Sequence, residues 1–281
     1  MSSEAASSSK DYCGDHPPQL RYDLPSVSDI QTTDKELQLP VDILLLTVEH
    51  GEFLACYQQL KNPYRQWFDG LGYVYFEEED ESEKEKMKIA LLKCYRASVG
   101  PGSSVVSVEN AVTVLRPKTV ISVGACSGLS PEKTKLGDVV VSSKLTTYTS
   151  KVVMSDQEQS TGLRPYISKR FLDFIKNCAD GWQTPLKNPG ANQVVNVHCG
   201  EILSGPERIQ AECRRDQLAK CNLMAMAVET EREGVWCLLC QIVVLETCKF
   251  LIVLLLIWAQ QSCAMICKIS EILREMQCEL M

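Results

Sequence analysis

The stretch Thr119–Ser142, TVISVGACSGLSPEKTKLGDVVVS, has the order of a strand, a glycine-rich turn, a short loop and a second strand. Thr119–Val123 is a short β-branched run after Pro117, which is typical of a buried strand. In Gly124–Gly128, which we call the crest, two glycines permit positive φ and let backbone N–H groups approach a ligand. Val139–Val141 predicts the second buried strand. Taken alone, such a segment is better explained as an ordinary tight turn.

Two segments before the crest predict further elements of an α/β protein. Val41–Val48 is a continuous apolar run after Pro40, which fits a central strand covered on both faces. The residues that follow have apolar side chains at helical spacing, which places Glu52 at a junction between strand and helix. A second helix is predicted where four apolar residues recur with the same period, at Val105, Val108, Val112 and Leu115.

Three other stretches accompany the crest in a fixed order: Val41–Phe53 (VDILLLTVEHGEF), Val197–Pro206 (VHCGEILSGP) and Ala227–Gly234 (AVETEREG). Together with the crest and the Leu-Gly-Asp-Val-Val that follows it, they resemble the nucleoside phosphorylase and nucleosidase superfamily. The resemblance covers roughly Val41–Trp236. It implies an α/β fold, a three-layer α/β/α sandwich around a mixed, partly barrel-like central sheet. It also implies a homo-oligomer, because active sites of the family lie near subunit interfaces.

The amino-acid composition indicates which kinds of partner and which cellular compartment to expect. The net charge of −7 and pI near 5.2 argue against nucleic acid as a main partner, since binding to phosphate backbones requires a basic face. The polar N-terminus does not resemble a signal peptide, so we expect a cytoplasmic protein whose 14 cysteines are reduced. The Cys237/Cys240 and Cys263/Cys267 pairs lie in apolar sequence without a nearby histidine, so neither a metal nor another cofactor is expected.

The chain divides into three parts by composition. Residues 1–38 are polar and without hydrophobic period, so we expect a disordered N-terminal segment. Residues 39–236 hold the phosphorylase-like domain, and residues 237–281 form a divergent apolar tail. Residues 235–259 are long enough to span a bilayer but carry Glu246 and Lys249 near the middle. Three interpretations stay open for this tail: it completes the domain, it anchors the chain in a membrane, or it is a poorly folded end.

The resemblance assigns Glu52 to the position of the family glutamate that activates the attacking water in nucleosidases. An acidic residue in the first helical turn, favoured by the helix dipole, is the structural alternative. The substrate base is expected to lie between the crest and a second segment. These residues are Gly124, Ala125, Cys126 and Gly128 on one side and Ile202, Leu203 and Ser204 on the other. Ser204 would also serve as the cap of a helix beginning at Glu207.

The motif Glu229-Thr230-Glu231 resembles the segment with which the family binds ribose. The resemblance places the contact with the sugar hydroxyls on Glu231, and Thr230 stands where the family has methionine. A solvated acidic patch at the start of a helix is the alternative. Two histidines are interpreted without a catalytic role, His198 as structural and His50 as a solvated loop residue.

Two departures from the family pattern bear on the nucleophile of the reaction and on the acid that assists the leaving base. The family phosphorylases hold phosphate with arginines, but this chain has Thr47–His50 and Ser122 at those places, which favours water over phosphate as co-substrate. Gln260 stands near the place of the family aspartate that assists the leaving base, and a glutamine amide cannot give up a proton at neutral pH. The sequence therefore predicts a purine nucleosidase weakened by this loss, with a catalytically impaired nucleoside-binding or scaffold domain as the alternative.

Overall fold

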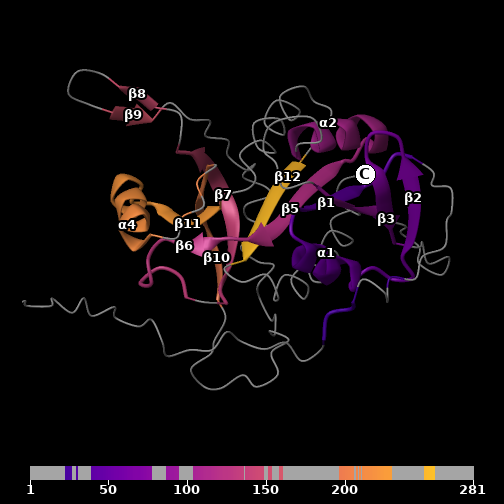
Figure 1. Ribbon diagram of the computed structural model, residues 1–281, viewed down its shortest axis with the longest axis horizontal. Coiled ribbons are helices and arrows are strands. Elements are labelled where there is room, and N and C mark those ends of the chain that lie inside the picture. The colour runs from indigo at the N-terminus through magenta and orange to yellow at the C-terminus, as the bar shows by residue number, and fades with distance from the viewer. Residues whose placement is uncertain are drawn as a thin grey trace, which may run out of the picture.

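The computed structural model of the 281-residue chain has one large sheet between helices (Figure 1). It describes residues 23–26, 30, 39–77, 87–94, 104–135, 137–148, 151–153, 158–160, 196–205, 207, 209, 211–229 and 250–256, with the backbone alone at 104–105, 151–153, 158–160 and 250–256. The predicted segment 1–38 falls largely outside these residues. The boundaries of the three predicted parts of the chain stay a prediction.

The N-terminal half of the sheet is built around β1 (Ile43–Thr47), all of whose residues are buried. It pairs in parallel with β4 (Ile89–Lys93) on one side and β5 (Thr119–Ala125) on the other. An antiparallel hairpin of β2 (Tyr64–Phe68) and β3 (Gly72–Phe76) extends the sheet beyond β4. No pattern in the sequence described above predicts β2, β3 or β4. The Asp69-Gly70 pair was an available hairpin signal, since Gly70 adopts φ 78° at the turn.

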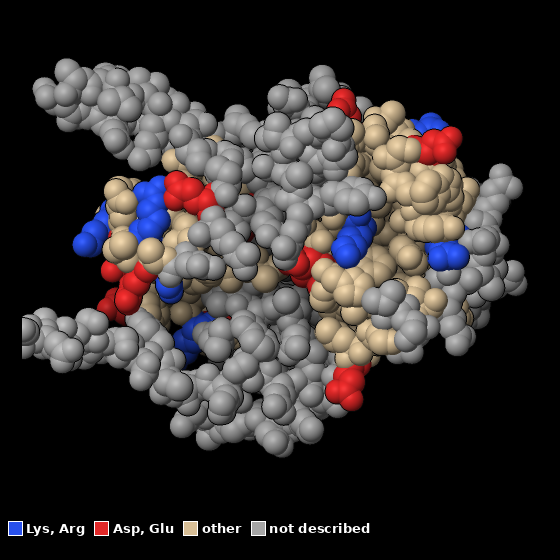
Figure 2. All heavy atoms as spheres, viewed as in Figure 1, with Lys and Arg blue, Asp and Glu red and all other residues tan. Residues whose placement is uncertain are grey.

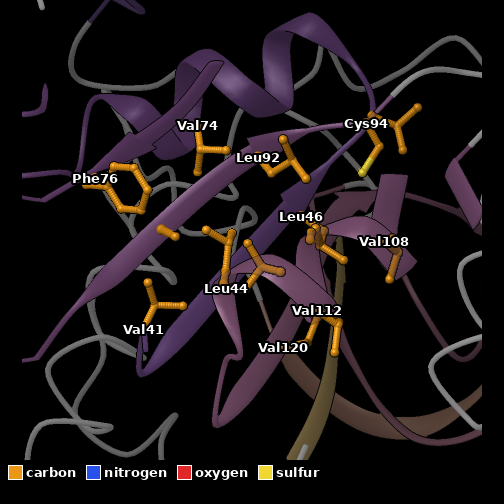
Figure 3. Close-up of a cluster of buried hydrophobic side chains, with 14 of the residues drawn as sticks. Val41, Leu44, Leu46, Val74, Phe76, Leu92, Cys94, Val108, Val112 and Val120 are labelled. Atoms are coloured by element: carbon orange, nitrogen blue, oxygen red, sulfur yellow. The ribbon is translucent and has the colours of Figure 1, made fainter. Parts of the chain in front are cut away.

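Helices cover both faces of this half, as the three-layer prediction requires. The helix α1 (His50–Tyr57) contributes Phe53 and Leu54 to a buried cluster that contains Ile121 and Val123 of β5. The helix α2 (Ser104–Leu115) lies on the other face, where Val108 and its apolar neighbours pack against the strands (Figure 3). The helical spacing predicted for α2 is confirmed.

The second half of the sheet bends until it closes on itself. Its strands are β7 (Val139–Thr147), β10 (Val197–Ser204), β11 (Ala225–Glu229) and β12 (Phe250–Leu256), in the order β5-β12-β7-β10-β11-β6. The two-residue strand β6 (Ser127–Gly128) follows β5 after one residue and pairs with β11. Because β5 and β6 are nearly continuous, these six strands form a closed circuit, which confirms the partly barrel-like sheet.

The remaining elements lie at one end of the molecule. The strands β8 (Lys151–Val153) and β9 (Glu158–Ser160) form a separate two-stranded ribbon. The helix α4 (Glu212–Cys221) lies beside β11 (Figure 1), and charged side chains of both signs gather over it (Figure 2). Helix α4 begins at Glu212, so the predicted helix from Glu207 with a Ser204 cap is wrong. Ser204 instead ends β10, which begins at Val197.

The apolar tail contributes β12 to the sheet. This strand lies between β5, which it joins in parallel, and β7, which it joins in antiparallel fashion. Seven consecutive apolar residues suit a strand with neighbours on both sides. Within the part of the chain that the structure describes, no helix has the length and apolar character needed to cross a bilayer.

Candidate functional site

The carboxylate of Glu52 connects helix α1 to the crest. Its Oε1 accepts the backbone N–H of Ala125 at 2.8 Å, across 73 positions of sequence. Its Oε2 accepts the N–H groups of Val48 at 3.1 Å and Glu49 at 3.0 Å. Reaching back to Glu49 is the capping-box arrangement expected of an acid at the third helical position. Glu52 is only 2% exposed, so the structure buries this carboxylate beside the crest.

The crest has an extended backbone, which corrects the expected use of its glycines. Gly124 lies in β5 and Gly128 in β6, and neither is among the described glycines with positive φ. Positive φ occurs instead at Gly137, with φ 98°, in the turn before β7. Cys126, between the two strands, is buried against Ile202 and other apolar side chains. The crest is therefore the corner at which the closed part of the sheet turns.

The ends of β10 and β11 lie next to this corner. Val228 pairs with Ser127 of the crest, and Glu229 pairs with Ser204. The Ser204 hydroxyl donates to the Glu229 carboxylate, and both residues are buried. Alternation along a strand puts Ser204 on the same face as Ile202, which packs against Cys126. The structure thus brings Glu52, the crest, Ile202, Ser204 and Glu229 into one region.

Other predicted site residues fall elsewhere. The Leu203 side chain points to the opposite face of β10, where it packs with Leu218 of α4, so its side chain does not meet the crest. Thr230, Glu231 and Gln260 lie outside the described residues. The roles predicted for Glu231 and Gln260 therefore stay predictions. Strand β11 ends two residues before Glu231, and strand β12 ends four residues before Gln260.

Tyr148 supports the Ser204 segment, and none of the sequence patterns described above predicted this role. Its N–H donates to the Ser204 carbonyl at 3.2 Å, while the N–H of Gly205 donates to the Glu229 carbonyl at 3.3 Å. The Tyr148 ring lies so close to Gly205 that a Cβ there would be 2.4 Å from the ring carbon Cζ. Burial, and secondly the negative charge of Glu207, raise the pKa of Tyr148 to about 12 from its ordinary 10.0.

His198 has a specific structural partner, in line with its predicted role. Its Nε2 lies 2.8 Å from Oδ2 of Asp138, a carboxylate that is 2% exposed. Asp138 also accepts the N–H groups of Lys135 and Asn196, both at 2.9 Å. This carboxylate therefore ties the loop before β7 to the start of β10.

His50 is exposed, as predicted, but it lies in a helix and not in a loop. It is the first residue of α1, and its Nδ1 lies 3.2 Å from the Nζ of Lys93, the last residue of β4. Its ring also stacks on Phe53, with centroids 6.4 Å apart. Lys93 was missed because nothing in its local sequence separates it from an ordinary exposed lysine at a strand end.

The closed sheet, the covering helices and the crest together define a nucleoside phosphorylase/nucleosidase fold, as the sequence resemblance predicted. No family model matches the chain. A futalosine hydrolase mutant of Helicobacter pylori strain 26695 superposes with a TM-score of 0.62 at 13% identity, over 85% of this chain and 100% of that one. A methylthioadenosine/S-adenosylhomocysteine nucleosidase of S. pneumoniae gives 0.62 at 16%, over 83% and 100%. The Neisseria meningitidis nucleosidase gives 0.61 at 17%, over 83% and 99%.

One curated relative matches part of the chain. A death domain-containing ATP nucleosidase of Amphimedon queenslandica is 23% identical over 137 residues, which cover 44% of this chain. The match spans only 26% of that relative's length. The solved structures described above are 13–17% identical to this chain, and at such identities their similarity shows the fold alone.

Proposed function

We propose that this protein cleaves the N-ribosidic bond of a purine nucleoside and that water, rather than phosphate, is the nucleophile. The observation that carries the proposal is the bond between the Glu52 carboxylate and the N–H of Ala125. It holds a buried carboxylate at the crest, at the carboxyl ends of parallel strands, which is where open α/β sheets bind their ligands. The similar solved structures are named as nucleosidases and a hydrolase, which supports water over phosphate as the nucleophile.

In this proposal Glu52 orients the attacking water. The water oxygen bonds to the anomeric carbon while the bond to the purine nitrogen breaks, and the sugar carries positive charge in the transition state. Glu52 accepts the proton that the water loses, and the departing base takes a proton from solvent. A fixed carboxylate favours that charge and positions the water without rearranging during the reaction. Glu231 holds the ribose hydroxyls, as the resemblance implies. The segment Ile202–Ser204, together with the crest, frames the base.

The missing acid limits the expected rate. General acid catalysis commonly contributes about 10²- to 10⁴-fold, so Gln260 in place of an aspartate predicts slow release of the base. This departure also motivates the second candidate, a domain that binds nucleosides without cleaving them. The two candidates differ in one observable, the appearance of free base.

The test uses the full chain with inosine, adenosine and methylthioadenosine, each with and without inorganic phosphate, and follows free base. We expect release that does not depend on phosphate and that is lost in Glu231→Gln. Binding without release would favour the nucleoside-binding domain, and release only with phosphate would contradict hydrolysis. In addition, Gln260→Asp is expected to raise any activity.

A further inference from the structure

The pair His50 and Lys93 lies at the same end of the sheet as the crest. Lys93 is the partner of Thr47 in the β4–β1 pairing, and β1 in turn pairs with β5, which leads into the crest. The carboxyl ends of these three parallel strands therefore meet at one end of the sheet. His50 lies two residues before Glu52 in α1, so their Cα atoms are only about 5 Å apart in an α-helix.

The two side chains leave the helix in different directions. Glu52 reaches toward β5, where it binds Ala125, whereas His50 reaches toward β4, where it meets Lys93. Between them lies Gly51, at which an added Cβ would meet no described atom within 4 Å outside its own helix and its two neighbours. At the Cβ position of Gly51, no described side chain therefore covers the backbone between Glu52 and the His50–Lys93 pair.

Hydrogen-bonding chemistry decides what this pair can bind. An ammonium group only donates, so Lys93 donates to Nδ1 of the neutral imidazole at 3.2 Å. The proton of the ring is then on Nε2, which is also a donor. The pair consequently offers the remaining ammonium N–H groups and the Nε2–H, and no acceptor. Its complement is a group that only accepts and carries negative charge.

Within the described residues, no acid balances the charge of this pair. Both side chains are exposed, and among the residues that the structure describes no carboxylate forms an ion pair with Lys93. Lys118, by contrast, lies at the opposite end of the strands and pairs with Asp42 at 2.8 Å. In a chain of net charge −7, an unbalanced cation beside the candidate site is a local attraction for an anion.

We propose that Lys93 and His50 bind a phosphate group carried on the sugar of the substrate, so that the substrate class is a purine nucleotide. This inference rests on the proposed function for the place of the sugar beside Glu52. A phosphate has three acceptor oxygens and negative charge, which matches a surface made only of donors. A neutral nucleoside leaves the same donors unused.

The test compares adenosine 5′-monophosphate, adenosine and inorganic phosphate as probes of the full chain. Binding is measured by titration calorimetry, and free adenine is followed in parallel. The wild type is expected to bind the monophosphate more tightly than adenosine. Lys93→Gln is expected to weaken binding of the monophosphate about ten- to a hundredfold and to leave adenosine within about twofold, since one charge-assisted contact is removed. His50→Phe keeps the ring on Phe53 and is expected to have a smaller effect of the same kind.

The control is Lys118→Gln, which removes the same charge at the other end of the strands and is expected to change neither affinity. Circular dichroism of each variant establishes that it is folded. Equal affinity of the wild type for the monophosphate and adenosine would overturn the inference, and so would an equal loss of both in Lys93→Gln. Inorganic phosphate that binds through Lys93 and accelerates cleavage of adenosine would overturn the assignment of the phosphate to the substrate.

The two proposals fail in different ways. Binding of the monophosphate that depends on Lys93, without any release of adenine, supports the phosphate contact and contradicts cleavage. Cleavage of adenosine without preference for the monophosphate supports cleavage and contradicts the phosphate contact.

Discussion

Replacement of Glu52 by glutamine tests whether its carboxylate holds the crest in place. In the protein, three backbone N–H groups donate to this side chain, from Val48, Glu49 and Ala125. A glutamine oxygen can keep the two bonds of Oε2, but its amide group then faces the Ala125 N–H, so two donors meet at 2.8 Å. Loss of one charge-assisted bond, together with two donors that face each other at a partly buried position, predicts a loss of about 3 kcal/mol in the free energy of unfolding.

The assay is urea unfolding followed by circular dichroism, together with release of free base under conditions where the variant is folded. A loss of about 3 kcal/mol lowers the urea midpoint by about 1–2 M if the slope is unchanged. If Glu52 also orients water, kcat falls by at least about a hundredfold in the folded variant. The matched control is Glu109→Gln, because Glu109 is exposed on α2, and its effect is expected to stay within about 0.5 kcal/mol. A midpoint of Glu52→Gln equal to that of the control would refute the bond to the crest.

Three further predictions concern the packing around the site. Gly205→Ala places a Cβ 2.4 Å from the Tyr148 ring and is expected to cost about 1–3 kcal/mol in thermal unfolding, whereas Gly51→Ala, with open space at its Cβ, is expected to be neutral or mildly stabilising. The raised pKa of Tyr148, about 12 against 10.0 when unfolded, predicts a contribution of about 2–3 kcal/mol that is complete below pH 10 and lost as pH rises toward 12, because the unfolded chain releases this proton first. Urea midpoints of Tyr148→Phe measured across that range should lack this decline, and a decline identical to that of the wild type would contradict the assignment. Asp138→Asn is expected to lower stability by about 2–4 kcal/mol, because it weakens two backbone bonds and the contact with His198, and an unchanged melting temperature would contradict that role.

Local sequence was sufficient for the elements with a strong period. The buried runs predicted β1 and β5, and the spacing of apolar residues predicted α2. The ordered motifs also predicted the class of fold, which the solved structures confirm. The hairpin of β2 and β3 was missed because aromatic side chains stand on both faces of its strands, so the sequence does not show that Val74 and Phe76 are the buried residues of β3.

The candidate site was predicted less completely, because its contacts join distant parts of the chain. The sequence indicated Glu52 and the crest separately, but the bond between them spans 73 residues. Tyr148 lies 56 residues before Ser204 in the chain, and only the parallel pairing of β7 with β10 brings its ring against Gly205. Likewise, no pattern near Lys93 indicates His50, 43 residues earlier.

For this protein the sequence by itself determined which segments are buried and which superfamily they resemble, since hydrophobic period and short motifs are local properties of a chain. Tertiary structure alone decided where the carboxylate of Glu52 ends, which lysine stands beside His50 and how the sheet closes through β6. These are consequences of strand order and register, which depend on pairing between segments far apart in sequence.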